Sequence, residues 1–298
     1  MSKPVPLLKV GDYEYIERAN QACQGCAGAI VSRIVSKVLG ANAVRAEVAC
    51  CGPAFMNIKN PSIYAEVFEG AGALMTGISR GLKKIGREDV VVYGIIGDGG
   101  TVDIGFQGLS AAAERNENIL WIVYDNEAYM NTGGQRSSAT TPYAITTTTP
   151  QGKFSRGKKE QKKSVPLMVA LHGVPYVATA SVSYPEDLIG KLEYAKSLKG
   201  FRFIHISAPC PTGWNYDPKD TIKIGRAMVQ AGLWPLFEII DGEKFRLTYK
   251  PKELKPVREV LKSQGRFRHT TDEEINEIQQ QVTRFWERLV QKDGGSLF

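Results

Sequence analysis

Two apolar runs joined by one crossover constrain the fold of this chain more than any other feature. Val90–Ile96 is followed by Gly-Asp-Gly-Gly at positions 97–100, and Ile119–Tyr124 is followed by Asp-Asn at positions 125–126. Runs of this kind are typical of buried parallel strands. A strand–helix–strand crossover brings the carboxyl ends of its two strands to one edge of a sheet, where α/β proteins bind ligands. The sequence therefore predicts that Asp98 and Asn126 lie together at that edge.

The rest of the chain continues this alternation of strand and helix patterns. Apolar runs predict strands at 43–49, 176–181 and 201–207, and helical spacing predicts helices at 67–83, 106–115, 165–173 and 185–198. The last helix opens with a capping box, Thr271 with Glu274, and carries an apolar stripe from Ile275 to Leu289. The predicted fold class is α/β, with a mostly parallel sheet flanked by helices and a C-terminal helical tail.

Asp98 and Asn126 have the chemistry of a magnesium site. A carboxylate and an amide carbonyl are hard oxygen ligands, and Mg²⁺ completes its shell with phosphates and water. The glycines at 97, 99 and 100 let the backbone approach a diphosphate closely. A Gly-Asp-Gly sequence also occurs in plain turns. The asparagine 28 positions after Asp98 (126 − 98), followed by Tyr-Met-Asn-Thr-Gly-Gly-Gln at 129–135, favours the ligand site over the plain turn.

Five cysteines, an odd number, argue against a disulfide framework. Cys23 and Cys26 form a Cys-x-x-Cys pair, which suits a redox dithiol, half a zinc site or half a cluster site. Cys50 and Cys51 are adjacent, so at most one of them is expected to point into a given site. With Cys210 at the end of a predicted strand, this spacing favours four thiolates on a [4Fe–4S] cluster over a zinc ribbon.

Composition narrows the remaining classes. The chain has a net charge of +7, no apolar run long enough to span a bilayer, and no basic motif with interleaved aromatics. We expect neither membrane nor nucleic acid as a partner, and without an apolar leader run we expect a cytoplasmic protein. Residues 138–163 predict an ordered loop over the site that ends in a basic run. That run is either solvated or in contact with a phosphate or an acidic partner.

Taken together, the cysteine spacing, the Gly-Asp-Gly sequence and the 129–135 stretch resemble the β subunit of pyruvate:ferredoxin oxidoreductase (pyruvate synthase), over residues from roughly Cys23 to Trp214. The resemblance implies a thiamine diphosphate-binding fold, in which Asp98, Asn126 and the backbone carbonyl of Ala128 bind Mg²⁺. It places the cofactor against Gly97, Asp98, Gly99, Gly100, Asn126, Ala128, Tyr129, Asn131 and Thr132. Asn131 would be the catalytic residue near the thiazolium and the substrate.

The same resemblance implies that Cys23, Cys26, Cys51 and Cys210 hold one [4Fe–4S] cluster. Cys50 stands where the family usually has glycine, and its role stays open. We expect residues 1–232 to form the domain that binds thiamine diphosphate, Mg²⁺ and the cluster. Residues 233–298 are expected to form a tail that packs on this body or on partner subunits.

The implied activity is the reversible, coenzyme A-dependent oxidative decarboxylation of pyruvate, with electrons passing through the cluster to ferredoxin. Thiamine enzymes use a glutamate at the cofactor's aminopyrimidine ring, and the family places it on the α subunit. We therefore expect the chain to be inactive without α, and to assemble also with γ- and δ-type subunits or domains. Alternatives are another 2-oxoacid, such as oxalate, a branched-chain acid or 2-oxoglutarate, and a non-catalytic subunit with structural zinc. A nicotinamide enzyme is disfavoured because no G-x-G-x-x-G opening is present.

Overall fold

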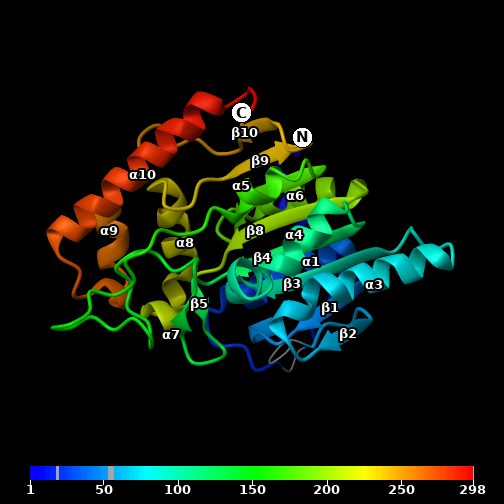
Figure 1. Cartoon of the computed structure of the whole chain (residues 1–298), viewed down its shortest axis with the longest axis horizontal. Coiled ribbons are helices and arrows are strands. Elements are labelled where there is room, and N and C mark those ends of the chain that lie inside the picture. Colours follow the sequence, from blue (N-terminus) through cyan, green and yellow to red (C-terminus); the bar gives the residue numbers. More distant parts are fainter. Residues whose placement is uncertain (18–19, 53–56, 298) are drawn as a thin grey trace.

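The computed structural model describes residues 1–17, 20–52 and 57–297. Among these residues the largest feature is an eight-stranded sheet, in the order β10-β9-β7-β8-β4-β3-β1-β2 (Figure 1). The strands from β7 to β2 in this order run parallel, whereas β9 and β10 are antiparallel to their neighbours. The strand bounds are Ala43–Val48 (β1), Ser62–Ala65 (β2), Val91–Gly97 (β3), Ile119–Asp125 (β4), Tyr176–Ser181 (β7), Phe201–Ser207 (β8), Phe237–Ile240 (β9) and Lys244–Leu247 (β10).

The two central runs are adjacent strands, as the sequence predicts. Every residue of β4 is buried, and β3 pairs with it in parallel up to Gly97 opposite Tyr124. The far side of β4 pairs with β8, where Asp125 lies opposite Ser207. The carboxyl ends of β3, β4 and β8 therefore lie side by side, because the strands are parallel and in close register. The predicted α/β class with a mostly parallel sheet is confirmed.

Helices cover both faces of the sheet (Figure 1). One apolar core contains residues of α1 (Ala27–Leu39) and α6 (Pro185–Ser197). Another contains residues of α3 (Ala71–Lys84), α4 (Phe106–Glu114) and α5 (Val165–Ala170). Both faces of the sheet are thus buried, which explains why its strands are continuous apolar runs rather than alternating ones.

The C-terminal segment belongs to the same sheet. β9 pairs with β7, and β10 completes a hairpin at the sheet edge. The helices α8 (Thr221–Gln230) and α9 (Val257–Lys262) share a core with the first turns of α10 (Asp272–Lys292). The capping box at Thr271 and Glu274 is present. The domain boundary expected at residue 232 stays a prediction. The strands β7 and β9 lie on either side of that residue and pair in one sheet.

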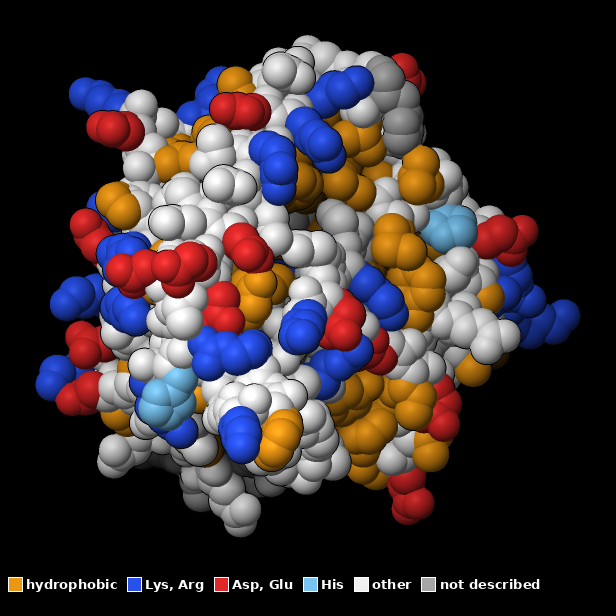
Figure 2. All heavy atoms as spheres, turned by 60° about the vertical axis from the view of Figure 1, so that its left-hand side comes forward, with side chains coloured by type: hydrophobic (Ala, Val, Ile, Leu, Met, Phe, Trp, Pro, Cys, Tyr) orange, Lys and Arg blue, Asp and Glu red, His pale blue; other side chains and the backbone are white. Residues whose placement is uncertain are grey.

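The basic run of the 138–163 loop is largely paired within the chain. Arg156 contacts Glu274 at 2.8 Å, Lys162 contacts Glu127 at 2.6 Å, and Lys163 contacts Asp103 at 3.2 Å. These cations bind the loop to acidic side chains of the same chain. The sequence predicted only a solvated run or contact with a phosphate or an acidic partner. Figure 2 shows acidic and basic side chains interspersed over one face, without a single basic patch.

No helix among the described residues is both long and apolar enough to cross a bilayer.

Candidate functional site

The carboxyl ends of β3 and β4 bring the predicted metal ligands together. Asp98 follows β3 directly and is 1% exposed, and Asn126 follows β4 and is 7% exposed. After Asn126 the chain enters a small hairpin of β5 (Ala128–Tyr129) and β6 (Gln135–Arg136). Glu127, which lies between Asn126 and β5, has a φ of +64°, a left-handed conformation that is uncommon outside glycine. This turn places the carbonyl of Ala128 beside the side chain of Asn126.

Three oxygens converge at this point. The side-chain oxygen of Asn126 faces only acceptors, and the position it occupies is 3.0 Å from Oδ1 of Asp98 and 2.8 Å from the carbonyl oxygen of Ala128. If the amide were turned, its nitrogen would donate to both. With bonds of about 2.0–2.1 Å, neighbouring oxygens in an octahedral Mg²⁺ shell are about 2.9 Å apart. With the amide oxygen turned toward Asp98 and Ala128, the spacing of these atoms therefore fits Mg²⁺.

The charge around Asp98 also suits a cation. Burial, and then the neighbouring Asp125, raise the pKa of Asp98 well above its usual value. Ser137 donates a hydrogen bond to its Oδ2. Within the described ranges, no lysine, arginine or histidine forms an ion pair with Asp98, whereas Asp125 contacts His205 at 2.8 Å. A carboxylate buried without a counter-charge is costly, and a bound cation would relieve that cost.

Glu127 is held from two distant segments. Its carboxylate accepts from Lys162 at 2.6 Å, from the Arg266 guanidinium at 2.7 Å and from the Thr141 hydroxyl at 2.7 Å. Burial alone would raise the pKa of Glu127, but Arg266 and Lys162 lower it to about 2. The residue between the two proposed metal ligands is therefore a fixed anion that anchors the turn.

The glycines after β3 leave room beside Asp98. A Cβ atom on Gly99 would lie 2.3 Å from the ring of Tyr129, whose hydroxyl donates to the Gly99 carbonyl at 3.0 Å. A narrow cleft runs along this segment, and all the cofactor residues that the resemblance implied line it. Asn131 and Thr132 are exposed and lie at its edge. The structure thus brings these sequence-predicted residues to one place.

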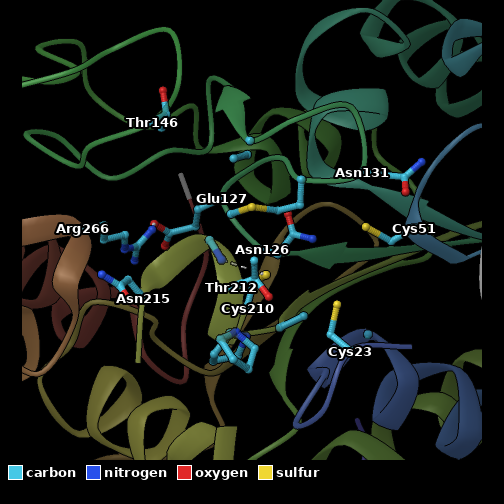
Figure 3. A pocket seen from close by; sticks show the side chains of 18 of the residues that line it. Cys23, Cys51, Asn126, Glu127, Asn131, Thr146, Cys210, Thr212, Asn215 and Arg266 are labelled. Atoms are coloured by element: carbon cyan, nitrogen blue, oxygen red, sulfur yellow. Dashed lines mark hydrogen bonds and ion pairs between the residues drawn. The ribbon is translucent and has the colours of Figure 1, made fainter. Parts of the chain in front are cut away.

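A larger cavity of about 620 Å³ adjoins this cleft and shares Cys51, Tyr124, Asn126, Ala128, Met130 and Asn131 with it. Its walls include all four cysteines that the resemblance assigned to a cluster, namely Cys23, Cys26, Cys51 and Cys210. Figure 3 shows Cys23 and Cys51 at one side, Cys210 in the middle, and Arg266 with Asn215 at the other. Cys26 lies just before α1, and Cys210 lies just before the short helix α7 (Pro211–Trp214) and accepts from Gly213 N at 3.4 Å.

Three of the thiols in this cavity resist losing their protons. Burial, and then the neighbouring thiols of Cys50, Cys210 and Cys26, raise the pKa of Cys51 to about 12. Burial also raises the pKa of Cys26 and of Cys210. Over the described part of the chain, no group of three or more Cys, His, Asp or Glu side chains already stands at metal-binding distance. Thiolate ligands here would need a positively charged centre to stabilise them, and four cysteines around one cavity fit a cluster of that kind.

The adjacent cysteines line different spaces. Cys51 lines the large cavity with the other three, whereas Cys50 lines only the narrow cleft and directs its thiol to the Ile95 carbonyl at 3.9 Å. Of these two cysteines, the one on the wall of the large cavity is thus Cys51, which the resemblance assigned to the cluster.

Three residues of the site were missed by the sequence analysis. Glu127 was not singled out, although its place between Asn126 and Ala128 could have marked it. Tyr124 looked like one more strand residue. Arg266 carries no local signal, because it reaches Glu127 from 139 positions away. It stacks on Trp214, with 3.8 Å between the guanidinium carbon and the ring centroid.

Comparison with known proteins identifies the family of this chain. Residues 52–206 match the family of the thiamine pyrophosphate enzyme, C-terminal TPP binding domain. The pyruvate synthase subunit PorB of Methanothermobacter thermautotrophicus is 47% identical, over 95% of this chain and 99% of that protein. The ketoisovalerate oxidoreductase subunit VorB of Pyrococcus abyssi is 45% identical, over 90% of each chain. A solved 2-oxoglutarate:ferredoxin oxidoreductase from Magnetococcus marinus shares the fold, with a TM-score of 0.57 and 21% identity, over 73% of this chain and 82% of that chain.

The fold and the first match define a thiamine pyrophosphate-binding protein. Within that class, the chain belongs to the family of 2-oxoacid oxidoreductase subunits that includes PorB and VorB. The resemblance to the β subunit of pyruvate synthase, stated from the sequence motifs, is thereby confirmed.

Proposed function

We propose that this chain is the β subunit of a pyruvate:ferredoxin oxidoreductase, which converts pyruvate and coenzyme A reversibly to acetyl-CoA and CO₂. One observation carries the proposal. The three-oxygen site of Asp98, Asn126 and Ala128 lies in a cleft that shares a wall with the cavity of the four cysteines. A thiamine cofactor and a cluster held at these two places would be neighbours, as one-electron transfer between them requires.

The residues of the cleft have separate roles in this proposal. Asp98, Asn126 and the Ala128 carbonyl would hold Mg²⁺, and Gly97, Gly99 and Gly100 would let the backbone approach the diphosphate. Asn131, exposed at the border of both cavities, would orient the substrate. When bound, thiamine diphosphate supplies the electron sink for decarboxylation of a 2-oxoacid.

The cysteine cavity is proposed to hold a [4Fe–4S] cluster on Cys23, Cys26, Cys51 and Cys210, which passes electrons to ferredoxin. All five cysteines are free thiols in the described structure. Free thiols are typical of the cytoplasm, where we place the protein. Structural zinc is the alternative occupant, since zinc also binds four thiolates. Iron and acid-labile sulfide in the anaerobically purified protein would support the cluster, and one zinc per chain would contradict it.

The active site is proposed to be completed by an α subunit. Glu127 lines the cavity, but the two cations that hold it lower its pKa to about 2, so it is unsuited to donate a proton near neutral pH. The glutamate that acts on the aminopyrimidine would come from α, and γ- and δ-type subunits would carry electrons onward to ferredoxin.

The test is pyruvate-dependent reduction of ferredoxin by the reconstituted complex. Activity should require coenzyme A, thiamine diphosphate and Mg²⁺, and the isolated chain should be inactive. Decarboxylation of pyruvate by the isolated chain would contradict the shared active site, and a fully assembled complex inactive on every 2-oxoacid would contradict the function.

A branched-chain 2-oxoacid is the second candidate substrate, because the ketoisovalerate oxidoreductase relative is nearly as similar to this chain as the pyruvate synthase relative. A panel of 2-oxoacids that includes 2-oxoglutarate and oxalate, compared by kcat/KM on the complex, separates them. We expect the highest kcat/KM for pyruvate, and a clear preference for 2-oxoisovalerate would overturn that choice.

A further inference from the structure

The wall between the two cavities contains a buried tyrosine to which the proposed function gives no role. Tyr124 is the residue before Asp125 at the end of β4, and its side chain is 3% exposed. It lines the large cavity with the four cysteines, and it also lines the narrow cleft with Asp98. Tyr124 is therefore one of the residues that the two proposed sites share.

Tyr124 contacts both neighbouring motifs through its ring. A Cβ atom on Gly28, two residues after Cys26, would lie 3.5 Å from a ring carbon. A Cβ atom on Gly97, which begins the Gly-Asp-Gly sequence, would lie 3.4 Å from the phenol oxygen. The side chain is therefore packed between the cysteine segment and the diphosphate segment.

The hydroxyl of Tyr124 is bonded to the backbone of Cys51. It accepts a hydrogen bond from the backbone N–H of Cys51 at 2.9 Å. The Cys51 amide would otherwise be one of the donors closest to the cavity, because Cys51 is on its wall. Hydrogen bonds to the sulfurs of an iron–sulfur cluster raise its reduction potential.

We infer that Tyr124 is a positioning residue for the cluster. Its hydroxyl fixes Cys51 by binding the Cys51 backbone amide, and it keeps that amide from donating to cluster sulfur. The inference rests on the proposed function. Its consequence is a lower cluster potential than the same four cysteines would otherwise set, so the reduced cluster is a stronger reductant for ferredoxin.

The variant Tyr124→Phe removes the acceptor and keeps the ring. In the anaerobically purified complex we expect its cluster midpoint potential, measured by EPR-monitored titration, to shift to more positive values with iron content unchanged. In hydrogen exchange, the Cys51 amide should exchange on the order of tenfold faster than in wild type. The exchange measurement needs no cluster, so it tests the contact even where the variant retains less iron.

Tyr93→Phe is the matched control. Tyr93 is a fully buried tyrosine of the adjacent strand β3, and its hydroxyl donates to Asn60 at 3.3 Å rather than bonding to a cysteine. This variant should leave both the potential and the Cys51 exchange rate at wild-type values. An unchanged cluster midpoint potential in Tyr124→Phe, with the iron content intact, would overturn this inference and leave the proposed function standing. A wild-type complex without iron would overturn the inference together with the proposed cluster.

Discussion

Replacing Glu127 by glutamine tests whether the metal-binding turn is fixed by charge. The change keeps the shape of the side chain and removes the anion that Lys162 and Arg266 contact at 2.6 and 2.7 Å. The side chain of Lys162 is 25% exposed and can turn toward water, but that of Arg266 is 3% exposed and cannot. Breaking a buried ion pair by removing one partner costs about 3–5 kcal/mol.

The shift in the pKa of Glu127 gives an independent value for the stability that Glu127→Gln removes. A fall in the pKa of Glu127 from 4.5 to about 2 corresponds to about 3 kcal/mol of stability. Because the folded-state pKa is the lower one, this stability is fully present above about pH 4.5 and is lost as the pH falls toward 2. Urea unfolding of the metal-free chain at pH 7 should therefore show Glu127→Gln to be less stable by about 3 kcal/mol, and the difference should narrow at acid pH.

Glu117→Gln is the matched control for this experiment. Glu117 also pairs with two arginines, but the side chains of Arg80 and Arg115 are 62% and 39% exposed and can be solvated after the change. We expect a loss of about 1 kcal/mol or less. A loss for Glu127→Gln no larger than that of the control, or a difference from wild type that persists unchanged down to pH 2, would refute the reasoning.

Three further changes test the two sites. Asp98→Asn should weaken Mg²⁺-dependent binding of thiamine diphosphate, measured by calorimetry, by more than about 100-fold. The same change should raise the unfolding midpoint of the metal-free chain, because a buried carboxylate without a counter-charge is removed. Cys51→Ser should lose iron and the EPR signal of the reduced cluster, whereas Cys50→Ser should keep both; equal loss in the two would contradict the placement of Cys51. Gly99→Ala should abolish cofactor binding, since its Cβ would press within 2.3 Å of a tyrosine ring, while Gly152→Ala, with nothing within 4 Å, should bind normally.

The centre of the fold was predictable because it depends on local pattern and on chain-crossing rules. β7 and β8 have the bounds expected from the sequence, since Tyr176–Ser181 and Phe201–Ser207 are apolar runs with clear ends. Asp98 and Asn126 meet because parallel strands joined by one crossover end at the same edge. The same geometry made the cysteines after β1 and β8 candidates for a shared site.

The parts that failed prediction depend on contacts between remote segments. Arg266 and Lys162 reach Glu127 from different segments, and no spacing along the chain indicates that they converge. The hairpin of β9 and β10 is short, and it joins the sheet only because β7 has a free edge. Tyr124 has the pattern of a core strand residue, and only its hydroxyl contact with Cys51 distinguishes it.

An anomalous difference map at the iron absorption edge, from crystals of the anaerobically purified complex, tests the central claim most directly. The account predicts an iron peak bounded by Cys23, Cys26, Cys51 and Cys210, beside thiamine diphosphate whose Mg²⁺ is held by Asp98, Asn126 and Ala128. A map without iron in that cavity, or with a zinc-edge peak there instead, would contradict it.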